Sequence, residues 1–255
     1  MTTNKISISK LIEQIIQKSN YRLKPKDVFD DIIQLTFNCV FSGQVQYEHN
    51  LFIDYWIDPA LKNAMTKNRY SEDNYKLLTQ ATGLFVNQFK TNEPFTNIVG
   101  EMYDEYLGDV LGQFLTPNDV ADLVAELHFE KEPITKNKII ADDMGCGSGS
   151  LILASLRNIL KNHGKEALKH IELVAMDIDM KMVQLCSIQI VLHCLFHRIE
   201  INNLKMYWAN TLTLLSPKDN SENVLALVWV QNKEVSQKMK SEKYKQDTQE
   251  FEHAK

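Results

Sequence analysis

The sequence has few of the features that mark secreted, membrane-spanning or strongly basic proteins. Its four cysteines, Cys39, Cys146, Cys186 and Cys194, form no Cys-x-x-Cys pair, and the N-terminus has no apolar signal-peptide core. No apolar run approaches the roughly 20 residues that span a bilayer. Lysine and arginine number 28 against 33 acidic residues, a formal net charge of -5. We therefore expect a cytoplasmic protein with no membrane partner, and any contact with nucleic acid should be local or supplied by a partner.

The first 108 residues predict a helical N-terminal subdomain. Apolar residues recur at helical spacing in 9–17 and 27–41, and Pro25 suits the first turn of the second segment. Ser71 is placed to cap a third helix over 72–89. Alternation of β-branched residues is scarce in this region. The subdomain is therefore expected to contain helices only, and its function is not evident from its residues.

The next part of the chain, 109–231, alternates predicted strands and helices. A helix is expected from Pro117, capped by Thr116 with Asp119 completing a capping box. Strands are then expected at 138–143, 171–177, 205–210 and 224–230, with helices at 150–163 and 180–196. This alternation is typical of an α/β fold with a Rossmann-like sheet. Residues 232–255 lose apolar periodicity and are expected to form a charged C-terminal tail.

A glycine-rich turn lies between the first of these strands and its helix. Gly145, Gly147 and Gly149 let the backbone turn sharply and approach a ligand, and Asp143 precedes them by two positions. A carboxylate there suits a ligand with a cationic amine. Asp177 ends the next strand, where an acid can accept hydrogen bonds from ribose hydroxyls, with Asp179 as the nearby competitor.

Two other interpretations of the glycine turn stay open on the residues alone. The first is an ordinary α/β turn with no ligand. The second is a nicotinamide or flavin Rossmann unit, which Ser150 disfavours because it stands where the third glycine of that fingerprint would fall.

Three stretches resemble the S-adenosylmethionine-dependent DNA adenine-N6 methyltransferases, specifically the modification subunits of type I restriction systems. They are GQFLTPNDVADLV at 112–124, ADDMGCGSGSLIL at 141–153, and VAMDIDMKMVQLCSIQIVLH at 174–193. They look like the family's threonine-proline motif, its glycine motif, and its acidic strand tip with the following helix. Their order is that of the family's gamma arrangement, and the match covers about residues 100 to 212.

The resemblance implies S-adenosylmethionine as cofactor and assigns roles to single residues. Phe114, Thr116 and Pro117 would embrace its methionine end. Asp143 would lie near the methionine amine, Asp177 would bind the ribose, and WANTL places Asn210 where a polar residue holds the adenine.

The family's catalytic motif, Asn/Asp/Ser-Pro-Pro-Tyr/Phe, does not follow the strand at 224–230. In the family its polar side chain accepts hydrogen bonds from the target amine, and its aromatic ring stacks on a flipped base. Here the strand is followed by QNKE, and the only displaced candidates are 92–95 and 216–218, which we interpret as turns or helix starts. The catalytic residues are therefore unknown.

Without the catalytic motif, three interpretations of the chain's function stay open. The chain is an adenine-N6 methyltransferase that acts with a separate specificity or methylation subunit, or a non-catalytic interaction protein that pairs with such subunits. The third reading is a truncated copy, since only about 25 residues follow the strand, and it would leave 224–230 as an exposed apolar sheet edge. His193, Cys194 and His197 could suggest zinc, but their helical spacing favours core packing, and no metal is expected.

Overall fold

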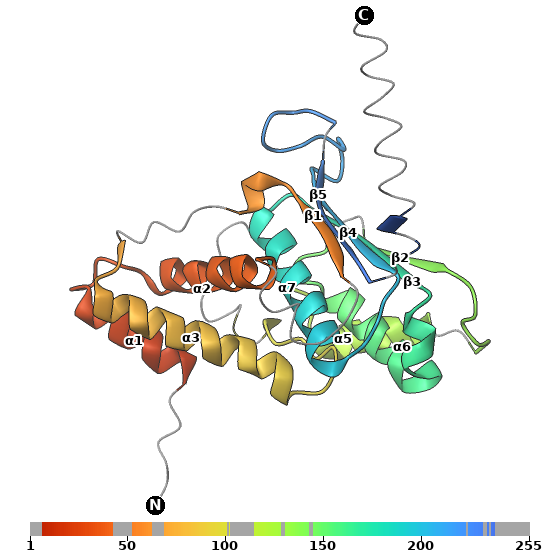
Figure 1. The fold of residues 1–255 in the computed structure, drawn as a ribbon, viewed down its shortest axis with the longest axis horizontal. Helices are drawn as coiled ribbons and strands as arrows, with labels where there is room; N and C mark the ends of the chain where they lie inside the picture. Colours follow the sequence, from red (N-terminus) through yellow and green to blue (C-terminus); the bar gives the residue numbers. More distant parts are fainter. Residues whose placement is uncertain are drawn as a thin grey trace, which may run out of the picture.

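The computed structural model describes residues 7–42, 53–62, 69–100, 102, 115–128, 131–142, 145–222, 224–231, 234, 236 and 237. Most of the C-terminal tail expected at 232–255 lies outside these residues. The chain builds a mixed α/β structure in which helices from its N-terminal part pack beside a five-stranded sheet (Figure 1).

Three helices form most of the described N-terminal part. They are α1 (Ile8–Lys18), α2 (Pro25–Val40) and α3 (Glu72–Thr91). Pro25 occupies the first turn of α2, and the Ser71 hydroxyl accepts a hydrogen bond from the Asn74 N–H at 3.3 Å, so both predicted helix starts are confirmed. A short 3-10 helix, η2 (Pro59–Leu61), lies between α2 and α3.

The expectation that this part contains helices only is wrong at one place. Strand β1 (Asp54–Ile57) pairs antiparallel with β5 (Leu225–Val230), with Asp54 opposite Val230 and Ile57 opposite Leu227. The segment is only four residues long and too short to show a clear alternation, so its pairing depends on a partner far away in the sequence. The N-terminal part thus contributes an edge strand to the sheet.

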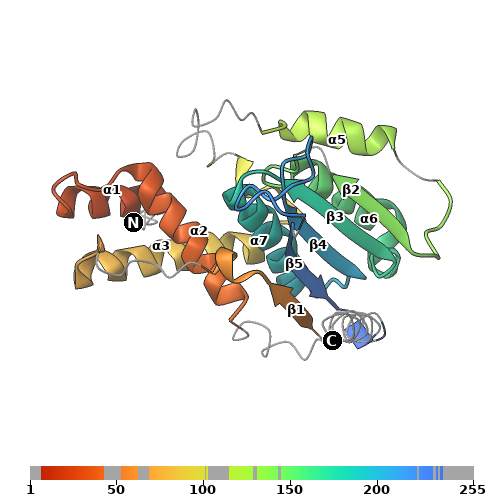
Figure 2. The same ribbon diagram turned by 90° about the horizontal axis from the view of Figure 1, so that it is seen from above.

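The other elements follow the predicted alternation. They are α5 (Asn118–Leu127), β2 (Lys138–Asp142), α6 (Ser150–Leu168), β3 (Ile171–Asp177), α7 (Met180–His197) and β4 (Asn203–Trp208). The sheet order is β1-β5-β4-β3-β2 (Figure 2). Strands β2, β3 and β4 are parallel and adjacent, joined by α6 and α7, which is the arrangement of one half of a Rossmann-like sheet.

Strand β5 does not continue the parallel part of the sheet. It pairs antiparallel with β4 on one side and with β1 on the other. The exposed edge that the truncated-copy interpretation predicts at 224–230 is therefore not found, because β1 pairs with this strand. Within the described residues, β1 and β2 are the two edge strands, and each is paired on one side only.

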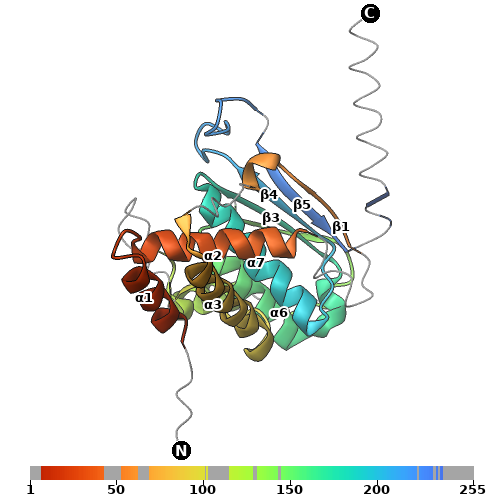
Figure 3. The same cartoon turned by 60° about the vertical axis from the view of Figure 1, so that its left-hand side comes forward.

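Helix α7 lies between the sheet and the N-terminal helices (Figure 3). Gln184 donates to the Leu61 carbonyl at 2.8 Å and to the Gln34 side chain at 3.0 Å, and Lys181 forms an ion pair with Asp30 of α2. One hydrophobic core runs through both parts of the chain.

Helix α7 is long and apolar enough to pass as a membrane span, contrary to the expectation from the sequence. However, 78% of that window is buried inside the protein, as in the core helix of a globular domain. Its apolar character is explained by the two layers that enclose it.

His193 gives this core a titratable group. Its side chain is fully buried beside Phe89 and Phe95, and its Nε2 lies 2.8 Å from the Thr96 carbonyl oxygen. Burial lowers the pKa of His193 from 6.5 to about 4. Because the pKa is depressed in the folded state, this contribution to stability is complete above about pH 6.5 and is lost as the pH falls through about 4.

We predict that His193→Gln flattens the acid side of the stability profile. Glutamine keeps a donor for the Thr96 carbonyl but cannot take up a proton, so the wild type should lose up to about 3 kcal/mol more than the variant between pH 6.5 and 4. Urea unfolding at several pH values measures this, with the exposed His128→Gln as control. Parallel profiles for wild type and His193→Gln would contradict it.

Candidate functional site

The glycine turn between β2 and α6 has the backbone conformation that the sequence predicted. Gly145, Gly147 and Gly149 have φ values of 119°, 53° and 96°, in the region that favours glycine. A Cβ on Gly149 would lie 2.9 Å from the Cys186 Sγ of α7, whereas one on Gly145 would meet no atom of the described residues within 4 Å. Gly149 therefore permits α6 to start against α7, and Gly145 leaves open space beside the turn.

Asp177 fastens this turn to the tip of β3. One carboxylate oxygen accepts a hydrogen bond from the Gly147 N–H and the other from the Asp179 N–H, each at 2.8 Å. The residue is 5% exposed, and burial raises the pKa of its carboxyl, although these two N–H donors act in the opposite direction. Asp179, the alternative acid, caps α7 by accepting from the Lys181 N–H.

The threonine-proline stretch reaches the same turn. Leu115 Cδ2 lies 3.1 Å from the position that a Cβ on Gly147 would occupy. The expected cap is wrong, since α5 starts at Asn118 with Pro117 as N-cap and no side-chain cap bond. Thr116 is half-buried and Pro117 is exposed. Proline has no side-chain acceptor, so the helix start is held by other contacts.

A polar cluster of Asn97, Asn118, Ser148, Ser150 and Gln189, buried except for Asn118, joins these segments. The Asn97 amide donates to Asn118 Oδ1 and Ser150 Oγ, both at 3.0 Å. Gln189 of α7 donates to Asn97 Oδ1 at 3.2 Å and to the Ser148 carbonyl at 2.8 Å. The cluster therefore links the start of α5, the end of the glycine turn and α7 at one point.

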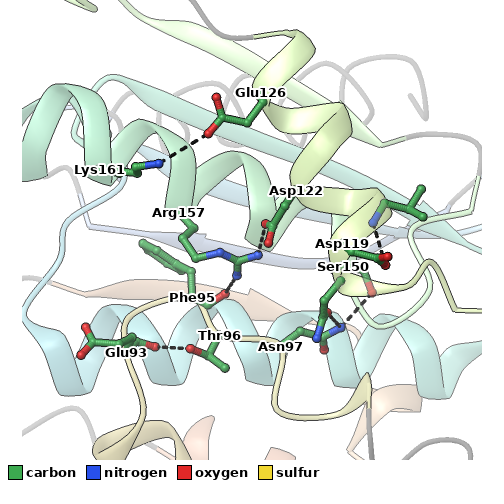
Figure 4. Close-up of polar contacts among 12 residues, drawn as sticks. Glu93, Phe95, Thr96, Asn97, Asp119, Asp122, Glu126, Ser150, Arg157 and Lys161 are labelled. Atoms are coloured by element: carbon green, nitrogen blue, oxygen red, sulfur yellow. Dashed lines mark hydrogen bonds and ion pairs between the residues drawn. The ribbon is translucent and has the colours of Figure 1, made fainter.

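Contacts of α6 with α5 and the 93–97 segment extend this arrangement outward (Figure 4). Arg157 donates to the Phe95 carbonyl at 2.6 Å and forms an ion pair with Asp122 of α5. Lys161 and Glu126 lie 3.6 Å apart on the same pair of helices. This exposed pair contributes little, on the order of 0–1 kcal/mol, so the buried cluster is the stronger constraint.

Asn210 follows the tip of β4, beside the tip of β3. The neighbouring Ala209 N–H donates to the Asp177 carbonyl at 3.0 Å, which holds the two strand ends together. The Asn210 side-chain oxygen accepts from the N–H groups of Leu212 and Thr213 at 2.9 and 3.3 Å. It therefore organises its own turn, while lying near the acid.

The strand tips do not bring a catalytic motif to this site. Strand β5 runs antiparallel to β4, and its last residue, Val230, lies opposite Asn203 at the start of β4. Gln231 consequently lies at the end of the sheet where the parallel strands begin, away from the glycine turn. Its side-chain oxygen accepts a hydrogen bond from the Ile201 N–H at 3.0 Å. The residues that follow the strand at 224–230 therefore lie away from the glycine turn.

The displaced candidates are not at strand tips either. Within 92–95, the Phe95 ring is fully buried and unable to stack on a base. Ser216 is buried in a loop, where its N–H donates to the Ser221 carbonyl at 2.8 Å. Phe114 and Asp143, two predicted cofactor residues, lie outside the described residues.

The histidines and cysteines of α7 are core residues. Cys186 and Cys194 are fully buried, and His197 Nε2 lies 2.9 Å from the Phe89 carbonyl oxygen. In the part of the chain that the structure describes, no group of three or more His, Cys, Asp or Glu side chains could hold a metal ion.

Three contributing residues were missed from the sequence: Leu115, Asn97 and Gln189. Gln189 left a signal, because a polar residue among the apolar residues of a buried helix needs a partner. Leu115 lies inside the threonine-proline stretch, but its contact with Gly147 is tertiary. Nothing in the sequence around Asn97 indicated its role.

We predict that Gly149→Ala destabilises the fold more than Gly145→Ala. Both alanines would have an unfavourable positive φ, but only the first would press on Cys186, and we expect an extra loss of about 1–3 kcal/mol. Chemical denaturation measures the difference. Removing the sulfur with Cys186→Ala should restore part of it in the double variant. Equal losses at the two glycines would argue against the close approach.

Comparison with known proteins identifies the family of this chain. The sequence profile described as N-6 DNA Methylase matches residues 96–255. The methylase subunit of type I restriction enzyme MpnII from Mycoplasma pneumoniae is 27% identical over 194 residues, which are 74% of this chain and 33% of that protein. The chain thus spans about a third of that curated relative.

A solved structure is also similar. It is the type I restriction-modification system methyltransferase subunit from Streptococcus thermophilus, at 16% identity and a TM-score of 0.43, covering 85% of this chain and 42% of that one. The profile covers more than half of the sequence and includes the glycine turn, Asp177 and Asn210. The chain therefore belongs to the N-6 DNA methylase family.

Proposed function

We propose that this chain binds S-adenosylmethionine at the glycine turn and the tips of β3 and β4, as part of an adenine-N6 DNA methylation system. The observation that carries the proposal is the convergence on Gly147. Leu115 of the threonine-proline stretch packs on it, and Asp177 accepts a hydrogen bond from its N–H. Segments that match the family at three separate places thus meet at one turn.

The residues fit the chemical groups of this cofactor. Its methionine carboxylate suits the start of α6, where first-turn N–H groups have no partner within the helix and the helix dipole favours an anion. Asp177 offers carboxylate lone pairs to ribose hydroxyls, and Gly145 leaves space beside the turn. By family resemblance, Asp143 holds the amine, Phe114, Thr116 and Pro117 close over the methionine, and Asn210 contacts the adenine.

When bound, the cofactor supplies a methyl group for direct transfer to the N6 amine of a flipped adenine. In this proposal the residues of the chain hold the cofactor and orient its methyl group toward the amine. This alignment of the reacting groups contributes to the rate. DNA would be reached in the cytoplasm with a separate specificity or methylation subunit, since this chain has a net charge of -5.

The second candidate is a non-catalytic subunit that binds the cofactor and pairs with a methylation or specificity subunit. The direction of β5 favours this second candidate, because Gln231 lies at the end of the strands that is away from the glycine turn. Both candidates predict cofactor binding, and they differ in turnover.

The first experiment is calorimetric titration of the purified chain with S-adenosylmethionine, followed by a methyl-transfer assay on unmethylated DNA in the same preparation. Binding with transfer supports an active methyltransferase. Binding without transfer supports the non-catalytic candidate, and the absence of binding would refute both.

We predict that Asp177→Ala weakens S-adenosylmethionine binding by about 1–3 kcal/mol, because the carboxylate is lost as a ribose acceptor and as the anchor of Gly147. The matched control is Asp179→Ala, which removes a helix cap and should cost about 1 kcal/mol of stability with cofactor affinity unchanged. Titration with thermal unfolding of both variants separates the two effects. Unchanged affinity in Asp177→Ala would remove this residue from the site.

A further inference from the structure

The turn between α1 and α2 concentrates positive charge on an acidic chain. Lys18, Arg22, Lys24 and Lys26 fall close together, and residues 14–26 include no acidic residue, whereas the whole chain has a net charge of -5. Lys26 is half-buried, and the other three side chains are exposed. Figure 1 and Figure 2 show α1 and the start of α2 at the end of the molecule away from the sheet.

The three exposed cations have no acidic partner in the described part of the chain. Lys18, Arg22 and Lys24 form no ion pair with another described residue. By contrast, Lys161 and Lys169 of α6 each pair with a glutamate. The charge of the turn is therefore not neutralised by these parts of the protein.

The acids that follow on α2 are already engaged with other cations. Asp27 and Asp31 lie 3.8 and 3.3 Å from the guanidinium of Arg69. Asp30 forms an ion pair with Lys181 of α7. These acids are thus balanced from the other side of α2, and the excess positive charge stays on the turn.

The backbone of the turn has a fixed shape. Asn20 and Tyr21 have φ values of 54° and 60°, in the left-handed region that residues with a side chain rarely occupy. The Tyr21 N–H donates to the Ile16 carbonyl at 3.0 Å, and the Leu23 N–H donates to Ser19 Oγ at 3.4 Å. Leu23 is buried and anchors the turn, whereas Tyr21 is 75% exposed. The turn therefore presents an aromatic ring to solvent among its cations.

A phosphate backbone matches this combination of side chains. Lysine and arginine bind phosphate oxygens by charge, and a tyrosine hydroxyl can donate to them. Duplex DNA has one negative charge per about 1.7 Å of its axis, so several cations of one turn can each meet a phosphate. An anionic membrane surface would also attract cations, but membrane-bound segments insert an apolar face, and Leu23 of this turn is buried in the protein.

We propose that the α1–α2 turn, residues 18–24, binds the phosphate backbone of duplex DNA. This inference rests on the proposed function and adds a surface of this chain that holds the DNA. The contact is independent of base sequence, because phosphates are the same at every base pair. It is also local, which is how a chain of net negative charge can bind a polyanion.

The test is a fluorescence anisotropy titration of labelled duplex DNA with the full chain at several salt concentrations. The test variant combines three substitutions in the turn: Lys18→Gln, Arg22→Gln and Lys24→Gln. The control variant changes the net charge equally on α6: Lys161→Gln, Lys165→Gln and Lys169→Gln. Circular dichroism and thermal unfolding establish that both variants are folded.

We expect the turn variant to bind DNA roughly tenfold more weakly, or worse, at low salt. The slope of the logarithm of affinity against the logarithm of salt concentration should fall in magnitude by about 2–3, because each lost phosphate contact removes about 0.9. The α6 variant should keep the affinity and slope of the wild type.

Tyr21→Ala provides a second variant that leaves the charge unchanged. It should weaken DNA binding by roughly two- to tenfold through the lost hydroxyl contact, with the salt slope unchanged.

Four results would overturn the inference. They are a wild type that does not bind DNA at low salt, equal weakening by the turn and α6 variants, an unchanged salt slope in the turn variant, or displacement of the DNA by phosphatidylserine vesicles that bind the turn more tightly.

Calorimetry with S-adenosylmethionine on the same variants keeps the two proposals apart. The turn variants should retain cofactor affinity, because the turn lies at the end of the molecule away from the sheet. A wild type that binds the cofactor but not DNA counts against the inference alone. A wild type whose DNA binding depends on the turn but that binds no cofactor counts against the proposed function alone.

Discussion

Helix α7 has to bury apolar side chains around its whole circumference, and the other elements are arranged to meet that need. The sheet covers one side of it and the N-terminal helices α2 and α3 cover the other. A helix of this kind is stable only when it is enclosed. The same helix carries Cys186, against which Gly149 packs, and Gln189, which bonds to the Ser148 carbonyl. The position of the glycine turn therefore depends on how α7 is enclosed.

Buried polar groups give this core a definite geometry. Gln189 donates a hydrogen bond to Asn97, which in turn donates to Asn118 and Ser150. A shift of α5 or α6 would therefore take a partner away from a buried amide. Such a loss costs about 1–3 kcal/mol for each group. Asp177 acts in the same way at the strand tip. These contacts hold the segments that match the N-6 DNA methylase family in register, although they lie far apart in the sequence.

The two edges of the sheet differ in their surroundings. At one edge lies β1, a strand from the N-terminal part that pairs with β5 on one side only. At the other lies β2, beside α5, α6 and a cavity of about 480 Å³. The proposed cofactor site lies at the carboxyl ends of the parallel strands, next to β2.

The sequence alone was sufficient for the glycine turn, for Asp177 at its strand tip and for each predicted strand and helix of the α/β part, because these depend on local periodicity and glycine conformation. The helix cap predicted at Thr116 was wrong, because contacts from Asn97 hold the start of α5. Strand β1 could not be predicted, because four residues carry too little pattern and its pairing with β5 joins residues about 170 positions apart. The antiparallel direction of β5 could not be predicted from the sequence either. A strand's period of two is the same in either direction, so its orientation and neighbours come only from packing in three dimensions.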